Sequence, residues 1–454
     1  MRPWALVLCL ACFSYSVSAQ SLNFNHVDST KNLPGGLNYT LESSFSKWLG
    51  KTEPRVNGTL SYNLRLSLGK VKVLMAPTFY YGQQSANYLS SLHQGSNVPF
   101  NYRQNGKFGH QFIGQLGYHF SKSTSLDAGF APFSDKQGFR GLMQNGTSVS
   151  QPYLRFQWRG ERLSFTYFYS LLSNQTSLKD EGGRSFFSKQ KGSIGHKLAY
   201  DNKWLHVAIF EQVVWAVKDS LSTRYFDPNY AIPFVPLRPV EFQTGSSDNV
   251  LVGAEGALKT SLGKFYGQLV LDEFKLKEAL DGTGWWANKW ALQIGYEKRF
   301  AWQENTLSFL LEHNRVRPFT FTHNFPSQGY SHRQNPIGHP LALNFTESLF
   351  RVAFTKNSWS GSLQQSYIQL GSRLAADGGD LLASNTTRAR DFNYKDVENP
   401  DAYTYSEIQL SYRLGKDLGQ LGLFAGARLK LANSDAYWFG FRFSKQLFTN
   451  TYAY

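Results

Sequence analysis

Apolar and polar residues alternate along most of this chain, with a period of two. Such alternation is typical of β-strands, because successive side chains point to opposite faces of a strand. A clear case spans residues 60–68, where polar residues separate the apolar residues Leu60, Tyr62, Leu64, Leu66 and Leu68. Residues 408–414 and 437–443 repeat the pattern near the end of the chain. The predicted strands therefore have one apolar and one polar face.

The pattern predicts about seventeen strands, many of them roughly 9–13 residues long, against a mode of about 5–6 residues in soluble proteins. We expect these strands at residues 60–68, 71–81, 110–120, 124–132, 152–159, 162–171, 195–201, 204–216, 249–259, 263–274, 287–300, 305–315, 347–356, 358–370, 404–414, 419–431 and 436–447. Short connections alternate roughly with long ones, and aromatic residues gather at strand ends, as in barrels that cross a membrane. The predicted fold is an all-β, transmembrane antiparallel β-barrel of about 16–18 strands, with its long loops folded into the lumen.

The composition agrees with a barrel and excludes other classes. Aromatic residues make up 16% of the 454 residues and charged residues 17%, while a typical soluble domain has about 25% charged residues. The mean hydropathy is −0.38, which excludes a bundle of transmembrane helices. So many aromatic residues also exclude a disordered chain. A large soluble β-sandwich or propeller stays open as an alternative, although no repeat of about 40–50 residues indicates a propeller.

The first nineteen residues have the features of a secretory signal peptide. Arg2 precedes an apolar run over residues 4–13, and small residues lead to a predicted cleavage after Ala19. Both cysteines, Cys9 and Cys12, lie in this segment, and a lipoprotein interpretation of Cys12 is the weaker one. An exported β protein without cysteine in its processed form favours the bacterial outer membrane. We expect a signal peptide at 1–19, a first strand, cap or plug at 20–50, and the barrel at 51–454.

Two long connections have unusual compositions. Residues 226–242 hold four prolines, which restrict the backbone and predict a stiff, extended loop whose aromatic residues pack inward. Residues 311–347 concentrate histidine, arginine and glutamate. The spacing of this second cluster is too loose for a metal site, and no nucleophile turn indicates acyl-transfer chemistry. A hydrogen-bonded network that holds a loop in the lumen is the favoured interpretation, and ligand binding is the next.

The candidate residues follow from these two segments and the neighbouring strands. The predicted lumen network consists of Asp272, Glu273, Glu312, Arg315, Arg317, His323 and His339. Within it, Asp272 and Glu273 are expected to pair with Arg315 and Arg317. Arg238 and Trp285 are weaker candidates for contacts with a ligand. No catalytic residue, metal or cofactor is expected.

The chain is basic, with a formal net charge of +15. Such a charge favours anionic partners, here an acidic surface polymer or the phosphates of lipopolysaccharide. A basic barrel also suits an anionic leaflet without any specific ligand. Nucleic acid is not an expected partner, because the sequence has no basic helix or zinc motif.

Several segments, taken together, resemble the Wzi-like capsule-assembly family of Bacteroidetes, which includes gliding-motility RemB-like outer-membrane proteins. The segments that carry the resemblance are Phe139-Arg-Gly-Leu-Met, Pro152-Tyr-Leu-Arg, Phe226-Asp-Pro-Asn-Tyr, Tyr266-Gly-Gln-Leu-Val-Leu-Asp-Glu-Phe, Trp285-Trp-Ala-Asn-Lys-Trp, Asn314-Arg-Val-Arg-Pro-Phe-Thr-Phe-Thr-His and Gly338-His-Pro-Leu. They span about residues 130–350. The resemblance implies a monomeric outer-membrane barrel that binds capsular or surface polysaccharide without catalysis, with a role in adhesion or gliding.

The leading hypothesis is thus a non-enzymatic outer-membrane barrel that binds or organises exopolysaccharide at the cell surface. A nutrient porin is the first alternative, and it requires an open lumen. A barrel enzyme acting on lipid or glycan is the second, although the sequence offers no leading nucleophile. A structural partner of a motility or export machine is the third.

Overall fold

A computed structural model describes residues 35–50, 55–82, 108–146, 150–179, 185–218, 223–233, 235–333, 335–389, 392–393, 401–415, 419–430 and 436–452. The expected signal peptide at 1–19 lies outside these residues. Residues 35–50, for which the sequence left strand, cap and plug open, form the first strand, β1.

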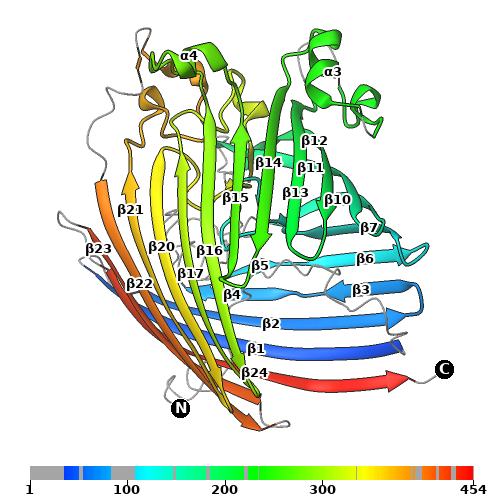
Figure 1. Cartoon of the computed structure of the whole chain (residues 1–454), viewed down its shortest axis with the longest axis vertical. Helices are drawn as coiled ribbons and strands as arrows, with labels where there is room; N and C mark the ends of the chain where they lie inside the picture. Colours follow the sequence, from blue (N-terminus) through cyan, green and yellow to red (C-terminus); the bar gives the residue numbers. More distant parts are fainter. Residues whose placement is uncertain are drawn as a thin grey trace.

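Twenty strands form one antiparallel sheet (Figure 1). They are β1 (Gly35–Gly50), β2 (Arg55–Leu68), β3 (Val71–Met75), β4 (Thr78–Gly82), β5 (Phe108–Gln111), β6 (Gly114–His119), β7 (Thr124–Ala131), β10 (Gln151–Arg159), β11 (Leu163–Lys179), β12 (Ser185–Asp201), β13 (Leu205–Ala216), β14 (Asn249–Lys259), β15 (Lys264–Leu271), β16 (Trp290–Trp302), β17 (Asn305–Val316), β20 (Phe345–Lys356), β21 (Trp359–Leu370), β22 (Asp401–Gly415), β23 (Gly419–Lys430) and β24 (Ala436–Tyr452). β1 pairs with β2 on one side and with β24 on the other, so the sheet closes into a barrel.

Two long strands of the barrel are interrupted, so each appears as two shorter strands. β3 and β4 both pair with β2, and β6 and β5 pair with β3 and β4 in turn. The interruption lies at Pro77, which has no N–H to donate to the ladder. Backbone hydrogen bonds between Ala76 and Ile113, at 2.7 and 3.2 Å, join the two interrupted strands at this point. When β3 with β4, and β5 with β6, are each counted as one interrupted strand, the described part of the barrel has eighteen strands. This confirms the predicted barrel and its even strand number.

The two faces of the strands differ as the alternation predicts where their side chains are described. On β16, Ile294 is 54% exposed on the outside, while its neighbour Gln293 is 1% exposed in the lumen. On β17, Leu311 is 52% exposed and Glu312 only 3%. An apolar outer surface around a polar interior is the arrangement that a barrel needs in lipid. Among the described residues, no helix is both long and apolar enough to span a membrane.

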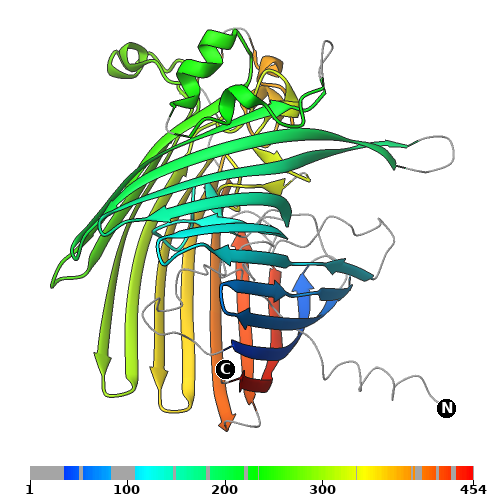
Figure 2. The same ribbon diagram turned by 90° about the vertical axis from the view of Figure 1, so that its right-hand side faces the viewer.

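The two ends of the barrel are unlike. Short turns such as 160–162, 202–204, 260–263 and 303–304 lie at one end of the strands, and the turn between β16 and β17 is at the bottom of Figure 1. The long connections lie at the other end and carry the short elements of the chain (Figure 2). These elements are β8 (Ser134–Asp135), β9 (Gln144–Asn145), η2 (Pro228–Tyr230), α3 (Leu237–Thr244), α4 (Leu276–Leu280), η3 (Pro326–Gln328), β18 (Ser331–His332), β19 (Asn335–Pro336), η4 (Ala375–Asp377) and η5 (Asn385–Thr387).

Residues 317–344 fill the long-loop end of the lumen, and we call them the plug. The plug packs into an apolar core with lumen-facing residues of many strands, among them Leu172, Phe210, Leu251, Val270, Ala291 and Ile368. Residues 132–146, the inserted hairpin that carries β8 and β9, enter the same core through Leu142 and Met143. These two segments confirm that long loops fold into the lumen.

The proline-rich segment 226–242 adopts a different structure from the one predicted. It forms η2 and α3, because Pro228 and Pro236 lie at helix starts, where no N–H donor is needed. Tyr230 and Leu237 pack on Val213 and Trp215, which point away from the lumen-facing residue Val214. The prediction that this loop is extended and packs inward is therefore wrong, because it covers the outside of the barrel at the long-loop end.

Candidate functional site: a lumen network beneath an aromatic rim

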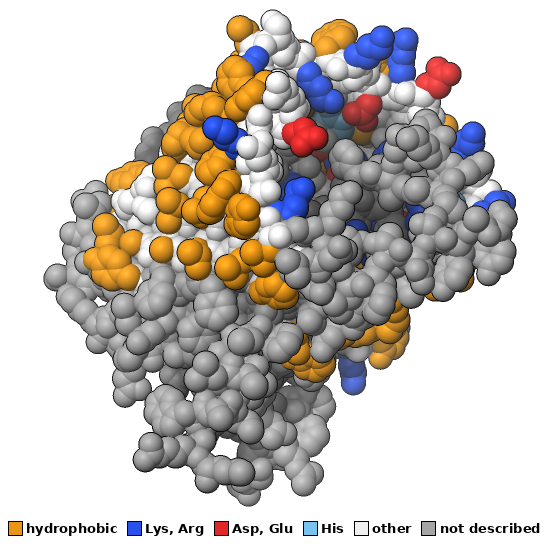
Figure 3. All heavy atoms as spheres, turned by 90° about the horizontal axis from the view of Figure 1, so that it is seen from below, with side chains coloured by type: hydrophobic (Ala, Val, Ile, Leu, Met, Phe, Trp, Pro, Cys, Tyr) orange, Lys and Arg blue, Asp and Glu red, His pale blue; other side chains and the backbone are white. Residues whose placement is uncertain are grey.

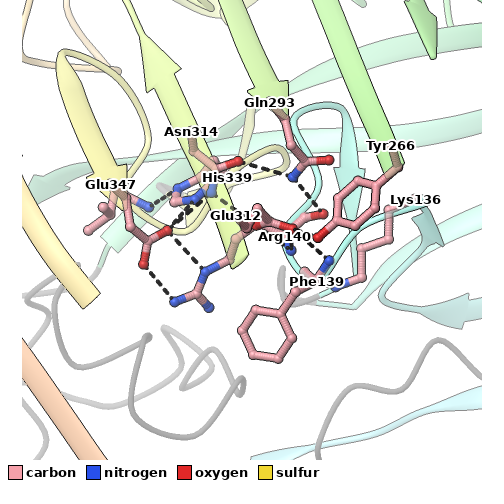
Figure 4. A network of polar contacts seen from close by, with 10 residues as sticks. Lys136, Phe139, Arg140, Tyr266, Gln293, Glu312, Asn314, His339 and Glu347 are labelled. Atoms are coloured by element: carbon pink, nitrogen blue, oxygen red, sulfur yellow. Dashed lines mark hydrogen bonds and ion pairs between the residues drawn. The ribbon is translucent and has the colours of Figure 1, made fainter. Parts of the chain in front are cut away.

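A buried ion pair joins the inserted hairpin to the barrel wall. The guanidinium of Arg140 donates to Glu347 of β20 from Nε at 3.2 Å and from Nη2 at 3.0 Å (Figure 4). Both side chains are buried, and the fork geometry matches the two carboxylate oxygens. His339 of the plug contacts the same carboxylate through Nε2 at 3.0 Å. Glu347 therefore holds the hairpin and the plug to one strand.

A second buried carboxylate fixes the backbone of the hairpin. Glu312 of β17 accepts hydrogen bonds from the backbone N–H groups of Phe139 at 2.8 Å and Arg140 at 3.1 Å. It also accepts from the hydroxyl of Tyr266 at 2.7 Å and from Nδ2 of Asn314 at 3.0 Å. These donors come from three different parts of the chain, so the hairpin has one defined position in the lumen (Figure 4).

The ring of His339 is neutral in this network. Burial lowers the pKa of His339, which disfavours the imidazolium form. Nδ1 accepts a hydrogen bond from the backbone N–H of Leu341 at 3.1 Å, so the proton resides on Nε2 and is donated to Glu347. One tautomer therefore satisfies both ring nitrogens.

A third group of charges holds the plug near the long-loop end. Nζ of Lys289 lies 3.2 Å from Asp272 Oδ2 and 3.2 Å from Glu273 Oε1, and it donates to Thr322 O at 3.0 Å. The backbone N–H of Phe321 donates to Asp272 at 2.8 Å. Burial raises the pKa of Asp272 to about 6, and Lys289 opposes the shift. Lys289 is therefore the described ion-pair partner of the two carboxylates that we expected to pair with Arg315 and Arg317.

The structure separates the predicted network into distinct places. Glu312 and His339 belong to the Arg140 network, and Asp272 and Glu273 to the Lys289 group. Arg315 is exposed on the opposite face of β17 from Glu312, with its guanidinium 5.6 Å from the ring centre of Trp290. It lies outside the lumen, because a strand of period two turns residues 312 and 315 to opposite faces.

The other predicted residues lie at the long-loop end. Arg317 is buried beside Trp290 and donates to Trp285 O at 3.4 Å. His323 accepts a hydrogen bond from Phe325 N at 3.2 Å, and burial lowers its pKa to about 4. Arg238 lies on α3, where it pairs with Glu241 at 3.1 Å and covers the ring of Phe242.

Sequence reasoning missed Arg140, Glu347 and Lys289 as site residues. Glu347 is a lone carboxylate at a lumen-facing strand position, and Lys289 directly precedes a strand. The sequence around each of these two residues gives no sign of its partner, because the partner lies far away in the chain. Arg140 lies in one of the segments that carry the family resemblance. Its charge within a long connection was the signal that could have identified it as a site residue.

Aromatic and cationic side chains form a cluster at the long-loop end, in which one plug residue, Phe319, takes part. We call it the rim cluster. It consists of Lys275, Trp285, Trp286, Phe319, Arg388 and Phe392. Nζ of Lys275 lies 4.3 Å from the ring centre of Trp285, and Cζ of Arg388 lies 3.6 Å from that of Trp286. The two tryptophans are partly exposed, and Trp285 pairs with Asn393 of another long loop. The cluster thus offers aromatic faces and positive charge together.

The described residues contain no group of three or more His, Cys, Asp or Glu side chains arranged to hold a metal ion. A polar cavity of about 530 Å³ lies at the other end of the lumen, below the inserted hairpin. It is lined by residues of β10 to β14 and by the turn 160–162. The lumen therefore has a filled long-loop half and a cavity toward the short turns.

No family profile and no curated protein sequence matches this chain. Among solved structures, it is similar to Wzi of Escherichia coli, an outer-membrane protein involved in group 1 capsule assembly and described as a carbohydrate-binding β-barrel. That likeness has a TM-score of 0.58 at 12% identity and covers 99% of this chain and 92% of Wzi. The outer-membrane protein OpdK of Pseudomonas aeruginosa has a TM-score of 0.50 at 8% identity, covering 91% of this chain and 98% of OpdK. At these identities the comparisons establish the fold, that of the large outer-membrane β-barrels.

Proposed function

We propose that this protein is a bacterial outer-membrane barrel that binds surface or capsular polysaccharide at its long-loop end and catalyses no reaction. The observation that carries the proposal is the rim cluster, which rests on the plug. Hydrogen bonds to buried charged groups hold the plug to the barrel: His339 contacts Glu347, the backbone N–H of Phe321 donates to Asp272, and Lys289 donates to Thr322 O. Long loops face the cell exterior in such barrels, and short turns face the periplasm. The rim cluster then meets the glycan layer.

The chemistry of the rim cluster suits an acidic sugar. The faces of Trp285 and Trp286 can cover the CH groups of sugar rings, and a guanidinium can bind a carboxylate with two parallel hydrogen bonds. Lys275 and Arg388 place positive charge beside these faces. The net charge of +15 adds long-range attraction for an anionic polymer.

The finer assignments belong to this proposal as well. The fold likeness to Wzi supports capsule binding as the physiological role, and the resemblance to Wzi-like proteins of Bacteroidetes supports a link to adhesion or gliding. We propose cleavage of residues 1–19, insertion as a monomer, and contact with lipopolysaccharide. A partner in a motility or export machine is compatible with this arrangement.

The test replaces both tryptophans of the rim cluster. In the purified, detergent-solubilised protein, Trp285→Ala with Trp286→Ala should weaken binding to acidic capsular polysaccharide by about tenfold, because two stacking faces are lost. Surface plasmon resonance against immobilised polysaccharide measures the change. The matched control is Trp204→Ala, which removes an exposed tryptophan at the short-turn end. Equal binding by the double variant and the native protein would leave the rim cluster without this role.

A diffusion channel is the second candidate, and the cavity of about 530 Å³ in the lumen favours it. A channel needs a continuous path, whereas the described plug residues pack closely against the wall at the long-loop end. Conductance in planar bilayers separates the two functions.

A further inference from the structure

The cavity at the short-turn end has walls built from consecutive strands. Its side walls are the lumen faces of β10, β11 and β12, its upper boundary is the inserted hairpin, and its lower edge includes the turn 160–162. Its volume of about 530 Å³ lies within the roughly 300–1,000 Å³ of small-molecule sites. Among the described residues seen from below, Lys and Arg side chains lie beside Asp and Glu side chains (Figure 3). The cavity therefore has the size and the position of a site reached from the periplasm.

Small side chains create this space. Ser164 of β11 lies opposite Ala199 of β12, and these two residues line the cavity together with Thr166. The hairpin stops above them, because Lys197 of β12 binds Asp135 at 2.6 Å and Lys264 of β15 donates to Gln137 O at 2.7 Å. The wall and the hairpin are thus both held in place around an unfilled volume.

The charges of the lining leave an excess of cations. Asp135 is paired with Lys197, and Asp201 with His206 at 2.8 Å. Arg155 is paired with Asp127 at 3.0 Å. The cations Arg159, Arg162 and Lys259 have no ion-pair partner in the described part of the chain, and the single remaining acid of the lining is Glu161. An anion that enters would neutralise charges that the protein itself leaves uncompensated.

Neutral polar side chains lie between these cations. Gln157, Ser164 and Thr166 line the cavity, and their side chains form no hydrogen bond to any described residue. An amide and two hydroxyls can each donate and accept, which is the pattern that matches the hydroxyl groups of a sugar. A site for a bare phosphate ion would need clustered donors alone. The combination of free cations and free hydroxyl-type groups therefore favours an acidic sugar.

We propose that the cavity formed by β10, β11, β12 and the inserted hairpin is a second glycan site, which binds carboxylate-bearing sugar residues from the periplasmic side. Arg159, Arg162 and Lys259 contact the carboxylates, and Gln157, Ser164 and Thr166 contact the hydroxyls. The ligand class rests on the proposed glycan-binding function, whereas the site is independent of the rim cluster. A barrel with this pair of sites contacts acidic glycan on both sides of the membrane.

The first experiment changes the charge of the rim of this cavity. Trigalacturonate is titrated into the full-length, detergent-solubilised protein by calorimetry, with neutral maltotriose as the comparison probe. The variant Arg159→Glu with Arg162→Glu should lower the affinity for trigalacturonate by at least about tenfold. The affinity for maltotriose should not change. Both arginines are exposed, so the barrel should still form, and heat-modifiable migration on a gel checks it. Arg413→Glu, another exposed arginine near the short-turn end but outside this cavity, is the matched control.

A second variant separates the cavity from simple surface charge. Ser164→Phe fills the space without changing any charge, and it should also reduce trigalacturonate binding by at least about tenfold. Raising the salt concentration should weaken binding to the native protein, because exposed charges are screened. Unchanged binding by Ser164→Phe in a folded barrel would overturn the proposal, since the ligand would then not occupy the cavity.

Further titrations with other ligands identify the ligand chemistry, and a variant of the rim cluster separates the two sites. Inorganic phosphate or glycerol phosphate binding as tightly as trigalacturonate would overturn the assignment to an acidic sugar, and so would equal binding of maltotriose. The variant Trp285→Ala with Trp286→Ala should bind trigalacturonate at the cavity as the native protein does. Loss of polysaccharide binding by that variant with retained trigalacturonate binding supports both proposals. Failure of the tryptophan test alone leaves the cavity result intact.

Discussion

At the scale of single residues, the contact between Arg140 and Glu347 decides where the inserted hairpin lies. Both groups are buried, and each has the other as its charged partner in the described network, together with the neutral ring of His339. A buried pair adds little net stability over an apolar pair of the same size, but a lone buried charge is costly. Removal of one partner is therefore the informative change.

We expect Arg140→Ala to lower the free energy of unfolding by about 3–5 kcal/mol, because Glu347 is left buried without its cation. Urea unfolding in detergent, followed by the loss of heat-modifiable migration, measures the change. The double variant Arg140→Ala with Glu347→Gln should recover part of the loss, since the uncompensated charge is gone. Arg299→Ala, at an exposed position, is the control. A loss as large in the control as in Arg140→Ala would contradict the assignment.

At the scale of elements, the plug brings neutral histidines into the barrel. Burial lowers the pKa of His332 to about 3 and that of His323 to about 4, and it also lowers the pKa of His339. In the unfolded chain these rings titrate near a pKa of about 6.5. Above that pH both states are neutral and the stability is fully present. As the pH falls below it, the unfolded chain binds protons that the folded plug excludes, so stability is lost.

The expected result is a fall in the thermal midpoint of the native protein as the pH is lowered from 7.5 to 5. A variant with His323→Gln, His332→Gln and His339→Gln should show a smaller fall, although its stability at pH 7.5 is lower. The difference between the two profiles isolates the histidines from Asp272, whose raised pKa acts in the opposite direction. His313→Gln is the control, because its ring lies partly exposed on β17. Parallel profiles for the native protein and the triple variant would rule out this contribution.

At the scale of the whole molecule, closure of the barrel and filling of its lumen have different structural causes. Closure follows from the pairing of β1 with β24, which leaves no free edge in the described sheet. Filling follows from the apolar core that the plug shares with the wall. The first property makes the protein an outer-membrane type of barrel, and the second is the property that the conductance of the protein tests.

In planar bilayers, the native protein should give no large, stable current. Replacement of residues 324–338 by a short Gly-Ser linker should produce one, because the shortened connection no longer fills the long-loop half of the lumen. Retention of heat-modifiable migration shows that the variant still forms a barrel. Large, stable currents through the native protein would favour the channel function.

The strands and the class of fold could be predicted from the sequence, and the charged contacts largely could not. Alternation such as that from Leu60 to Leu68 directly reports a strand with one lipid-facing side, because side-chain direction in a strand depends only on position. The same pattern reports nothing about partners across the lumen. Glu312 and His339 were recognised as network members by composition, yet Arg315 of the same segment lies outside the barrel.

By itself, the sequence determined the closed antiparallel barrel, its apolar outer band and the concentration of charge in residues 311–347. Only the tertiary structure decided that Arg140 meets Glu347 across 207 positions of the chain, that Lys289 pairs with Asp272, and that α3 covers the outside. The physical reason is that alternation is a local property of consecutive residues. The partner of a buried charge is set by which strands and loops the closed barrel brings together.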